Sequence, residues 1–380
     1  MKIIHLSDLH IGKRVNEFSM IEDQKYILNE ILHIIDKENP RVVIIAGDVY
    51  DKSVPSAEAV ELFDEFLFEL SERELEILII SGNHDSAERM SFGSRLFGAK
   101  GVHISPVYDG KIKEIIIEDE HGAVNFYLLP FVKPINVRHA FPEEEINNYS
   151  DAVEVAINSI ELRKNERNVL ITHQFVTGAI ASESEDAISV GGSDNVNGEI
   201  FEDFDYIALG HIHRPQKILR DTIRYCGTPL KYSFSEANHQ KSVTIVEIGT
   251  KTEDIAIRTE ELIPLRDMRE IKGSYMEVTS KSFYDETNVE DYIRITLTDE
   301  DDIPDAIGKL RTIYPNIMRL DYDNMRTRTD NIIDGADKVE LKSPLEHFED
   351  LYELQNNREV SDEQKEYLNE LIETLWEGRL

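Results

Sequence analysis

The feature that most constrains the fold is a run of four β-branched residues that leads to a single carboxylate. Residues 42–45 read Val-Val-Ile-Ile, and Ala46, Gly47 and Asp48 follow them directly. An uninterrupted β-branched run is typical of a strand buried on both faces, because a half-exposed strand would carry polar residues at alternate positions. Asp48 is therefore expected at the carboxyl end of a central strand, where open α/β sheets bind their ligands.

Four further segments share this layout of an apolar run followed by residues that commonly ligate metals. They are residues 3–10 (IIHLSDLH), 77–85 (ILIISGNHD), 169–173 (VLITH) and 206–213 (YIALGHIH). Residues two positions apart on a strand project to the same side, which pairs Asp8 with His10 and His211 with His213. Any one of these short motifs arises by chance, but all of them in order favour a shared metal site over separate structural roles.

The five segments together predict a site for two metal ions, with Asp48 between them. The expected ligands are Asp8, His10, Asp48, Asn83, His173, His211 and His213. Carboxylates combined with imidazoles suit manganese, iron or zinc better than magnesium. Two ions about 3.5–4 Å apart would lower the pKa of a bridging water and neutralise a phosphoryl oxygen, which points to phosphoester hydrolysis.

His84 differs in kind from the ligands because it directly follows Asn83 and should point away from it, toward a substrate. We expect His84 to be the catalytic residue, as a general acid or as a transition-state stabiliser at the leaving oxygen. Asp85 is expected either to orient this imidazole or to cap a helix starting near Ser86. Asp51 is expected in a turn or beside the ligands, without binding a metal.

Helical and strand-like stretches alternate through residues 1–265, the expected catalytic domain. Apolar residues recur at helical spacing in residues 22–37 and 56–71, the second stretch behind a Ser56 cap. Helices between strands predict a layered α/β sandwich. More closely spaced runs predict a second, more antiparallel sheet, at residues 112–117, 125–129, 223–226, 243–248 and 255–259.

Two smaller units are expected after the catalytic domain. Residues 268–328 predict a small α+β capping domain, with strands at 275–279, 291–297 and 317–321 and a helix from Pro304. Residues 341–380 predict a C-terminal helical hairpin with apolar faces. That hairpin either packs on its own domain or presents a groove to a partner helix.

Composition limits the range of functions. The net charge of −34 counts against a broad basic surface for nucleic acid, although metal ions can offset phosphate charge locally. The chain alone is therefore expected to bind DNA weakly. The single cysteine, Cys226, fits a reducing cytoplasm, and no apolar run approaches the length needed to span a membrane. The phosphate-binding pattern G-x-x-x-x-G-K-[ST] is absent, so a nucleotide-driven step would require another chain.

The series D-x-H, GD, GNHD, a lone strand-end histidine and GHIH resembles the calcineurin-like metallophosphoesterase superfamily. The segments IIHLSDLHIGK, GDVYD, VGGSDNV, FEDFDYIALGHIHRPQ and CGTPLKYSFSE look more narrowly like the SbcD family, the bacterial Mre-type double-strand-break repair nucleases. The resemblance covers residues 1 to about 250 and extends more loosely to the two later units. It implies a four-layer α/β/β/α sandwich.

The resemblance also implies an activity and partners. Asp8, His10, Asp48 and His213 would hold one Mn²⁺, and Asp48, Asn83, His173 and His211 the other, with His84 at the position of the family's catalytic histidine. The implied activity is a 3′-to-5′ exonuclease on duplex ends and an endonuclease on single strands and hairpins, in DNA repair, recombination and replication. A homodimer would act with an SbcC-type coiled-coil ATPase, in a heterotetramer, through the C-terminal segment.

Two other functions stay open. A phosphatase or small-nucleotide phosphodiesterase could use the same metals, but it would have little need for a capping domain and a partner-binding segment. A scaffold on an inactive phosphoesterase fold would have no reason to retain a full set of costly buried polar groups. The sequence therefore favours the nuclease.

Overall fold

The structure is a computed structural model that describes residues 1–185, 195–285 and 287–325, together with single positions between Leu345 and Leu371. One compact unit comprises Met1–Glu185 and Asn195–Asn324 and contains every sheet described below. The hairpin predicted at residues 341–380 lies outside the described residues except for those single positions. Among the described residues, no helix is long and apolar enough to cross a membrane.

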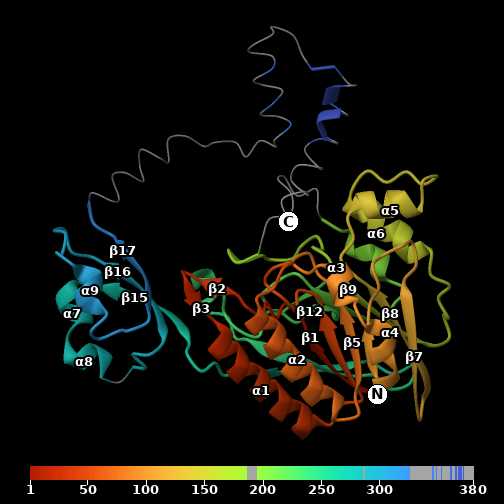
Figure 1. Cartoon of the computed structure of the whole chain (residues 1–380), viewed down its shortest axis with the longest axis horizontal. Helices are drawn as coiled ribbons and strands as arrows, with labels where there is room; N and C mark the ends of the chain where they lie inside the picture. The colour runs from red at the N-terminus through yellow and green to blue at the C-terminus, as the bar shows by residue number, and fades with distance from the viewer. Residues whose placement is uncertain are drawn as a thin grey trace. The chain divides into compact units, whose positions relative to one another are not determined.

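Two six-stranded sheets form the main body (Figure 1). The first has the order β14-β13-β1-β4-β5-β6, with bounds Ala256–Glu261, Ser242–Glu247, Lys2–Leu6, Val42–Ala46, Glu76–Ile80 and Val102–Ile104. The second has the order β11-β12-β10-β9-β8-β7, with bounds Gln216–Ile218, Arg220–Tyr225, Tyr206–Gly210, Arg167–His173, Gly122–Leu129 and Lys113–Asp119. A small ribbon pairs β2 (Arg14–Val15) with β3 (Phe18–Ser19).

The two predicted long helices are confirmed. Helix α1 spans Ile21–Glu38, and α2 spans Ala57–Ser71 with the Ser56 hydroxyl accepting a hydrogen bond from the Ala59 N–H at 3.2 Å. The shorter helices of the main body are α3 (Ala87–Met90), α4 (Ser94–Phe97), α5 (Pro134–Ala140) and α6 (Tyr149–Asn158), with 3₁₀ turns at Gly98–Lys100, Gly198–Phe201 and Phe234–Glu236.

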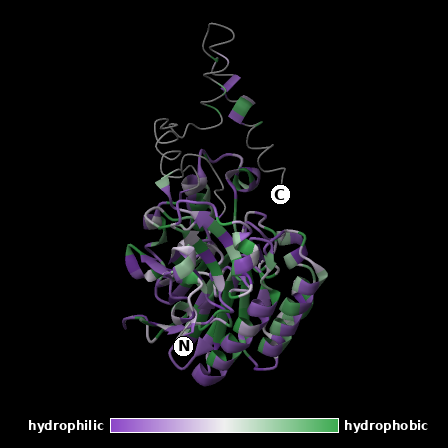
Figure 2. Ribbon diagram, turned by 90° about the vertical axis from the view of Figure 1, so that its left-hand side faces the viewer, coloured by the Kyte–Doolittle hydropathy of each residue, from purple (hydrophilic) through white to green (hydrophobic). Residues whose placement is uncertain are grey.

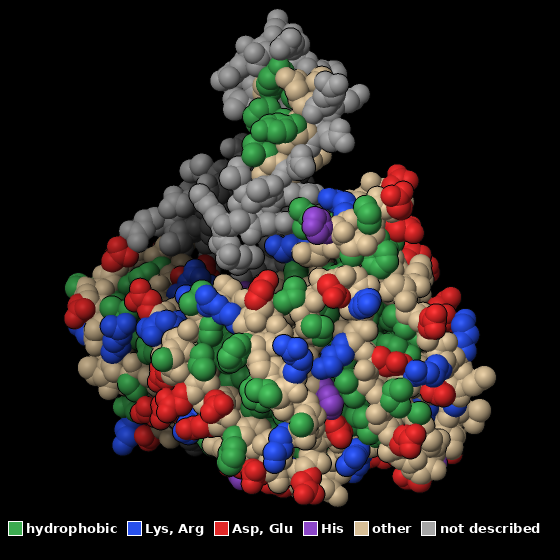
Figure 3. All heavy atoms as spheres, turned by 45° about the vertical axis from the view of Figure 1, so that its right-hand side comes forward, with side chains coloured by type: hydrophobic (Ala, Val, Ile, Leu, Met, Phe, Trp, Pro, Cys, Tyr) green, Lys and Arg blue, Asp and Glu red, His purple; other side chains and the backbone are tan. Residues whose placement is uncertain are grey.

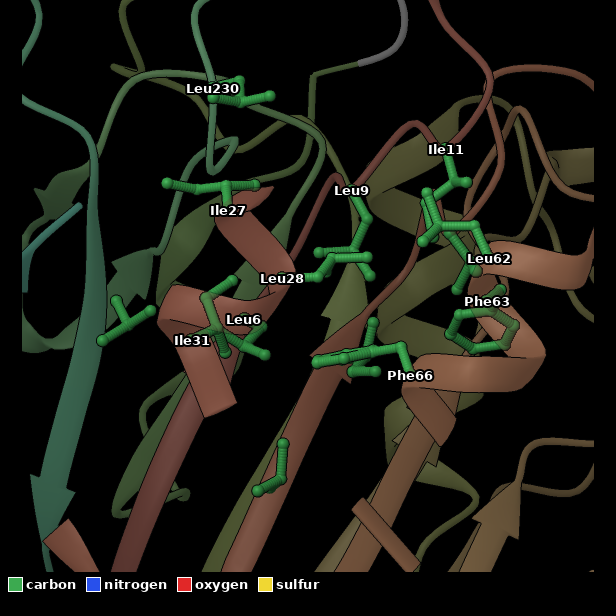
Figure 4. Packing of buried hydrophobic residues seen from close by; sticks show 14 of the residues in the cluster. Leu6, Leu9, Ile11, Ile27, Leu28, Ile31, Leu62, Phe63, Phe66 and Leu230 are labelled. Atoms are coloured by element: carbon green, nitrogen blue, oxygen red, sulfur yellow. The ribbon is translucent and has the colours of Figure 1, made fainter. Parts of the chain in front are cut away.

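Alternate residues of the central strands fill two separate cores. Val43 and Ile45 of β4 pack with α1 and α2, whereas Val42 and Ile44 pack against the second sheet. Figure 4 shows the first core, in which α1 and α2 meet β1 and the loop after it through Leu6, Leu9, Ile11, Ile27, Leu28, Ile31, Leu62, Phe63 and Phe66. In Figure 2 the strands inside the main body are mainly apolar, whereas its helices carry both polar and apolar residues. The α/β/β/α sandwich is confirmed.

One grouping of strands is wrong. The hairpin β13–β14 belongs to the first sheet, where β13 pairs antiparallel with β1 through Ile4 and Ile245. The second sheet is mixed: β8, β9, β10 and β12 run parallel, and only the edge strands β7 and β11 are antiparallel. Close spacing along the chain correctly indicates a hairpin, but it carries no information about which sheet the hairpin joins.

The segment after the main body forms a parallel three-stranded sheet of β15 (Met268–Gly273), β16 (Tyr292–Leu297) and β17 (Ile317–Tyr322). Helices α7 (Tyr275–Val278), α8 (Lys281–Tyr284) and α9 (Ala306–Leu310) lie in its connections. The strand predicted at 275–279 is wrong, because Ser274 and Glu277 form a capping box that starts α7. These two reciprocal hydrogen bonds outweigh the β-propensity of a short segment.

The three-stranded unit is joined to the main body by a buried carboxylate. Asp23 of α1 accepts hydrogen bonds from the Tyr292 hydroxyl at 2.7 Å and from Arg266 at 2.8 Å. Phe18 packs edge-on against the Tyr292 ring, with ring centroids 5.9 Å apart.

Candidate metal centre

The five predicted segments meet at one edge of the sandwich. In the first sheet β1, β4 and β5 are parallel neighbours, and in the second sheet β9 and β10 are, so their carboxyl ends lie together. The structure contains three groups of residues in which the ligand atoms lie within 4.8 Å of one another. They are Asp8, His10 and His213; His10, Asp48 and His84; and Asp8, Asp48 and His173. The Asn83 amide oxygen lies 3.0 Å from His173 Nε2 and 2.9 Å from His211 Nδ1. All seven expected ligands are thus brought together.

The backbone at this edge is strained in a way that aims the side chains. Four of the seven residues have positive φ: Asp8 at 52°, His10 at 45°, Asp48 at 47° and His211 at 102°. Residues other than glycine avoid this region, at a cost of about 1–3 kcal/mol each, and such residues cluster at functional sites. The fold maintains the strain at the positions where the sequence predicts metal ligands.

Two glycines allow the close approach of the two sheets. A Cβ on Gly210 would overlap the carbonyl oxygen of Ala46 and Nδ1 of His173. A Cβ on Gly47, whose φ is +88°, would overlap the same His173 ring. Glycine is therefore required at both positions, because any side chain would push β9 and β10 away from β4.

The surroundings of His173 are suited to a bound cation. His173 Nδ1 lies 2.8 Å from the Ala46 carbonyl oxygen, so it carries a proton and Nε2 faces the Asn83 amide oxygen at 3.0 Å and an Asp48 oxygen at 3.2 Å. Burial opposes a charge on His173, but the Asp48 carboxylate more than offsets it and raises the pKa of His173 to about 9. The proton at Nε2 thus occupies a position between oxygen ligands that a divalent cation would take over.

A second pair of nitrogens suits the other ion. His10 Nε2 lies 3.0 Å from His213 Nε2, and both rings are buried. Nitrogens this close could both bind one cation, because metal–nitrogen bonds are about 2.0–2.1 Å long. Among the described residues, the buried Asp8 Oδ2 has no hydrogen-bond partner, while Asp8 Oδ1 accepts from the His211 N–H at 2.9 Å. A carboxylate oxygen of Asp8 lies within 4.8 Å of ligand nitrogens of His10 and His213, so Asp8 can add an oxygen ligand beside the nitrogen pair.

Burial sets the protonation of the remaining ligands. Desolvation holds the pKa values of His10 and His213 well below the usual range and lowers the pKa of His211 to about 3, so these imidazoles are neutral and keep a lone pair. Burial also raises the pKa of Asp8 to about 7. Burial opposes ionisation of Asp48 as well, but His173 and His84 hold its pKa well below the usual range, so Asp48 is the central anion.

His84 lies at the same centre with its Nε2 turned toward the ligands. Its Nδ1 donates to the Asp51 carbonyl oxygen at 3.0 Å, and its Nε2 lies 4.0 Å from an Asp48 oxygen. The Asp51 carboxylate accepts from Lys13 at 2.8 Å and lies 3.8 Å from His10 Nδ1. Asp51 thus lies beside the ligands, as expected.

Neither role expected of Asp85 is observed. Its carboxylate accepts from the N–H groups of Val49 at 3.1 Å, Tyr50 at 3.0 Å and Gly82 at 3.0 Å. Ser86, and not Asp85, caps α3. Asp85 therefore joins the loops after β4 and β5, which carry Asp48 and Asn83. Sequence reasoning placed it near the site but could not identify backbone groups as its partners.

Sequence reasoning missed the polar cluster around His213. Ser184, Glu185, Glu236 and Lys241 all contact this residue directly or through one another. The only sequence signal was the segment that ends in Glu236, CGTPLKYSFSE, which contributes to the family resemblance without indicating a contact.

Comparison with known proteins identifies the family of this chain. Residues 1–215 match the family described as calcineurin-like phosphoesterase, and residues 264–356 match the type 5 capsule protein repressor C-terminal domain, SbcD_C. A relative from Staphylococcus epidermidis, named as the SbcD subunit of the nuclease SbcCD, is 36% identical over 326 residues, covering 84% of this chain and 85% of that protein.

Two solved structures show a weaker likeness. A dimetal phosphatase from Danio rerio has a TM-score of 0.42 at 11% identity, covering 69% of this chain and 96% of that chain. A 5′-nucleotidase precursor from Thermus thermophilus has a TM-score of 0.39 at 11% identity, covering 70% and 54%. The match to the calcineurin-like phosphoesterase family spans more than half of the chain. The chain belongs to the calcineurin-like phosphoesterase family and is a homologue of the SbcD nuclease subunit.

Proposed function

We propose that this chain is the metal-dependent nuclease subunit of an SbcCD-type complex and hydrolyses DNA phosphodiester bonds. The observation that carries the proposal is the convergence of seven ligand-type side chains from five strand ends, with the His84 imidazole facing the same centre. The relative named as a nuclease subunit supports a nucleic acid as the substrate.

Two divalent ions, with Mn²⁺ as the best match, are proposed to bind between the two sheets. Asp8, His10, Asp48 and His213 would hold one ion, and Asp48, Asn83, His173 and His211 the other. When bound, the ions would stabilise charge on the phosphoryl oxygens and lower the pKa of a water. Mixed oxygen and imidazole ligands favour manganese over magnesium.

His84 is proposed to carry the proton chemistry at the leaving oxygen. Nδ1 of His84 donates its proton to the Asp51 carbonyl, which fixes the ring. The imidazole can therefore act as an acid only in its imidazolium form, with a second proton on Nε2 that passes to the leaving oxygen. A general acid must lie within hydrogen-bond reach of the atom it protonates, and Nε2 is the nitrogen that faces the centre.

The proposed enzyme cleaves duplex DNA from its ends in the 3′-to-5′ direction and cleaves single strands and hairpins internally.

The surface charge supports the participation of partners. Figure 3 shows Lys and Arg side chains interspersed with Asp and Glu on one face of the molecule, and the chain carries a net charge of −34. A chain of this charge gains little from counterion release on DNA. We therefore propose that an SbcC-type coiled-coil ATPase supplies much of the DNA binding, and that residues 341–380 bind this ATPase.

The proposed domains are the nuclease domain at residues 1–265, the capping domain at 268–328 and the ATPase-binding segment at 341–380. The proposed location of the protein is the cytoplasm.

A homodimer is proposed through an apolar surface on the main body. Four large apolar side chains there are exposed, by between 42% and 83% each: Val60 of α2, Phe92, Leu96 and Phe97. Together with Leu67, several of these residues line an apolar groove of about 450 Å³. An exposed apolar groove of this kind is typical of a protein–protein contact.

The proposal is tested by cleavage of circular single-stranded DNA and of blunt duplex with the purified chain. Activity is expected with Mn²⁺, little with Mg²⁺, none with excess EDTA, and more after addition of the ATPase partner with ATP. Light scattering on the same sample is expected to report a dimer. Hydrolysis of nitrophenyl phosphate esters without cleavage of any DNA would instead favour a phosphatase, and no hydrolysis with any metal would favour a scaffold.

A further inference from the structure

A serine and a glutamate connect one ligand to the protein interior. His213 Nδ1 lies 2.6 Å from the hydroxyl of Ser184, and the same hydroxyl bonds to Oε1 of Glu236. Glu236 is fully buried. Nothing in the family motifs assigns a role to this carboxylate.

The hydrogen-bond donors and acceptors determine where each proton lies. Lys241 is 4% exposed and uses all three of its ammonium protons: on Glu236 Oε2, on the Thr228 hydroxyl at 2.7 Å and on the His213 carbonyl oxygen at 2.8 Å. Thr228 in turn donates to the Leu230 carbonyl oxygen at 2.7 Å, so it accepts from Lys241. A carboxylate paired with an ammonium can only accept hydrogen bonds.

These hydrogen bonds determine the tautomer of His213. Since Glu236 only accepts, the Ser184 hydroxyl must donate its single proton to Glu236. Ser184 can then only accept from the imidazole, so His213 carries its proton on Nδ1 and leaves a lone pair on Nε2. That lone pair faces His10 Nε2 at 3.0 Å, on the side where an ion is proposed.

The backbone of His213 is fixed by the same two parts of the chain. Its N–H donates to Glu185 Oε1 at 2.7 Å, and its carbonyl oxygen accepts from Lys241. Adjacent residues 184 and 185 thus contact the imidazole and the backbone N–H of His213, and Lys241 contacts its carbonyl oxygen.

We propose that Glu236, acting through Ser184, is a positioning residue that fixes His213 in the metal-binding tautomer and orientation. Ser184 contacts the imidazole and Glu236 reaches it only through Ser184, so neither is a catalytic residue. Groups that hold the second nitrogen of a ligating histidine typically change metal affinity by about 10–100-fold when removed. The inference rests on the proposed metal site, but the tautomer can be measured without metal.

The test uses Ser184→Ala, which removes the link to His213 and leaves the buried Glu236–Lys241 ion pair in place. Ser233→Ala is the matched control, because the Ser233 hydroxyl donates to the same Glu236 oxygen at 3.2 Å without reaching His213. Ser184→Thr restores the hydroxyl. Isothermal titration with Mn²⁺ is expected to show about 10–100-fold weaker binding at one of two sites in Ser184→Ala, and wild-type affinity in the other two variants.

A second measurement on the metal-free chain separates positioning from folding. Long-range ¹H–¹⁵N correlation spectra are expected to show His213 as the Nδ1–H tautomer in the wild type and a mixture of tautomers in Ser184→Ala, with the same melting temperature. Unchanged Mn²⁺ affinity in Ser184→Ala, or an Nε2–H tautomer in the wild type, would overturn the inference. Absence of Mn²⁺ binding to the wild type would instead refute the proposed site.

Discussion

Replacing His84 with alanine is the most direct test of how the centre divides its work. The backbone of this residue bonds to a proposed ligand, since the His84 N–H donates to Asp48 Oδ1 at 2.9 Å. Alanine keeps that N–H, so both ions are expected to bind with affinity within about threefold of the wild type. The imidazole is proposed to act through Nε2, and its loss removes the proposed proton donor.

The size of the effect follows from that geometry. Removing a positioned general acid typically slows the chemical step by about 10²–10⁴-fold, or about 3–5.5 kcal/mol of transition-state stabilisation. The cost in stability is smaller, because the variant loses the hydrogen bond to the Asp51 carbonyl and an edge contact with the His10 ring, whose centroid lies 4.8 Å away. One hydrogen bond contributes about 1 kcal/mol.

The assay is single-turnover cleavage of a labelled oligonucleotide at saturating Mn²⁺, with a Mn²⁺ binding isotherm on the same preparation. His33→Ala is the matched control, since that ring is mostly exposed and pairs with Glu30 at 3.2 Å, away from the centre. Undiminished cleavage by His84→Ala would remove the residue from the chemistry. Loss of metal binding together with cleavage would make His84 a ligand instead.

Three further changes test the packing of the two sheets, the buried carboxylate of Asp23 and metal binding. Gly210→Ala would place a Cβ against the Ala46 carbonyl oxygen and is expected to destabilise the chain by about 1–3 kcal/mol or more, measured by urea unfolding. A wild-type unfolding midpoint would contradict the close approach of the sheets. Tyr292→Phe leaves the buried Asp23 with one donor fewer, at a cost of about 1–3 kcal/mol at pH 7. Burial already raises the pKa of Asp23, so its folded form binds a proton more readily than its unfolded form, and the cost is expected to shrink at pH 5; an equal cost at both pH values would exclude this cause. Removing Mn²⁺ with EDTA is expected to lower the melting temperature, because an ion at 100 times its Kd stabilises by about 2.7 kcal/mol, and an unchanged melting curve would argue against a bound ion.

Local signals in the sequence were sufficient for the main elements. The β-branched run before Asp48 indicated a doubly buried strand, and β4 is buried at all five positions. Helical spacing and the Ser56 cap located α1 and α2. The strand predicted at 275–279 is wrong, because the Ser274–Glu277 capping box starts a helix there.

Residue type and order alone determined which side chains could form the centre, because each ligand follows its own strand and parallel strands bring their carboxyl ends together. How those side chains are held depends on contacts between residues far apart along the chain. The sheet that accepts β13, the backbone groups bound by Asp85 and the Ser184–Glu236 contact with His213 all join residues far apart along the chain. Such pairings depend on how the two sheets pack face to face, and no local pattern of residues shows which distant residues will meet.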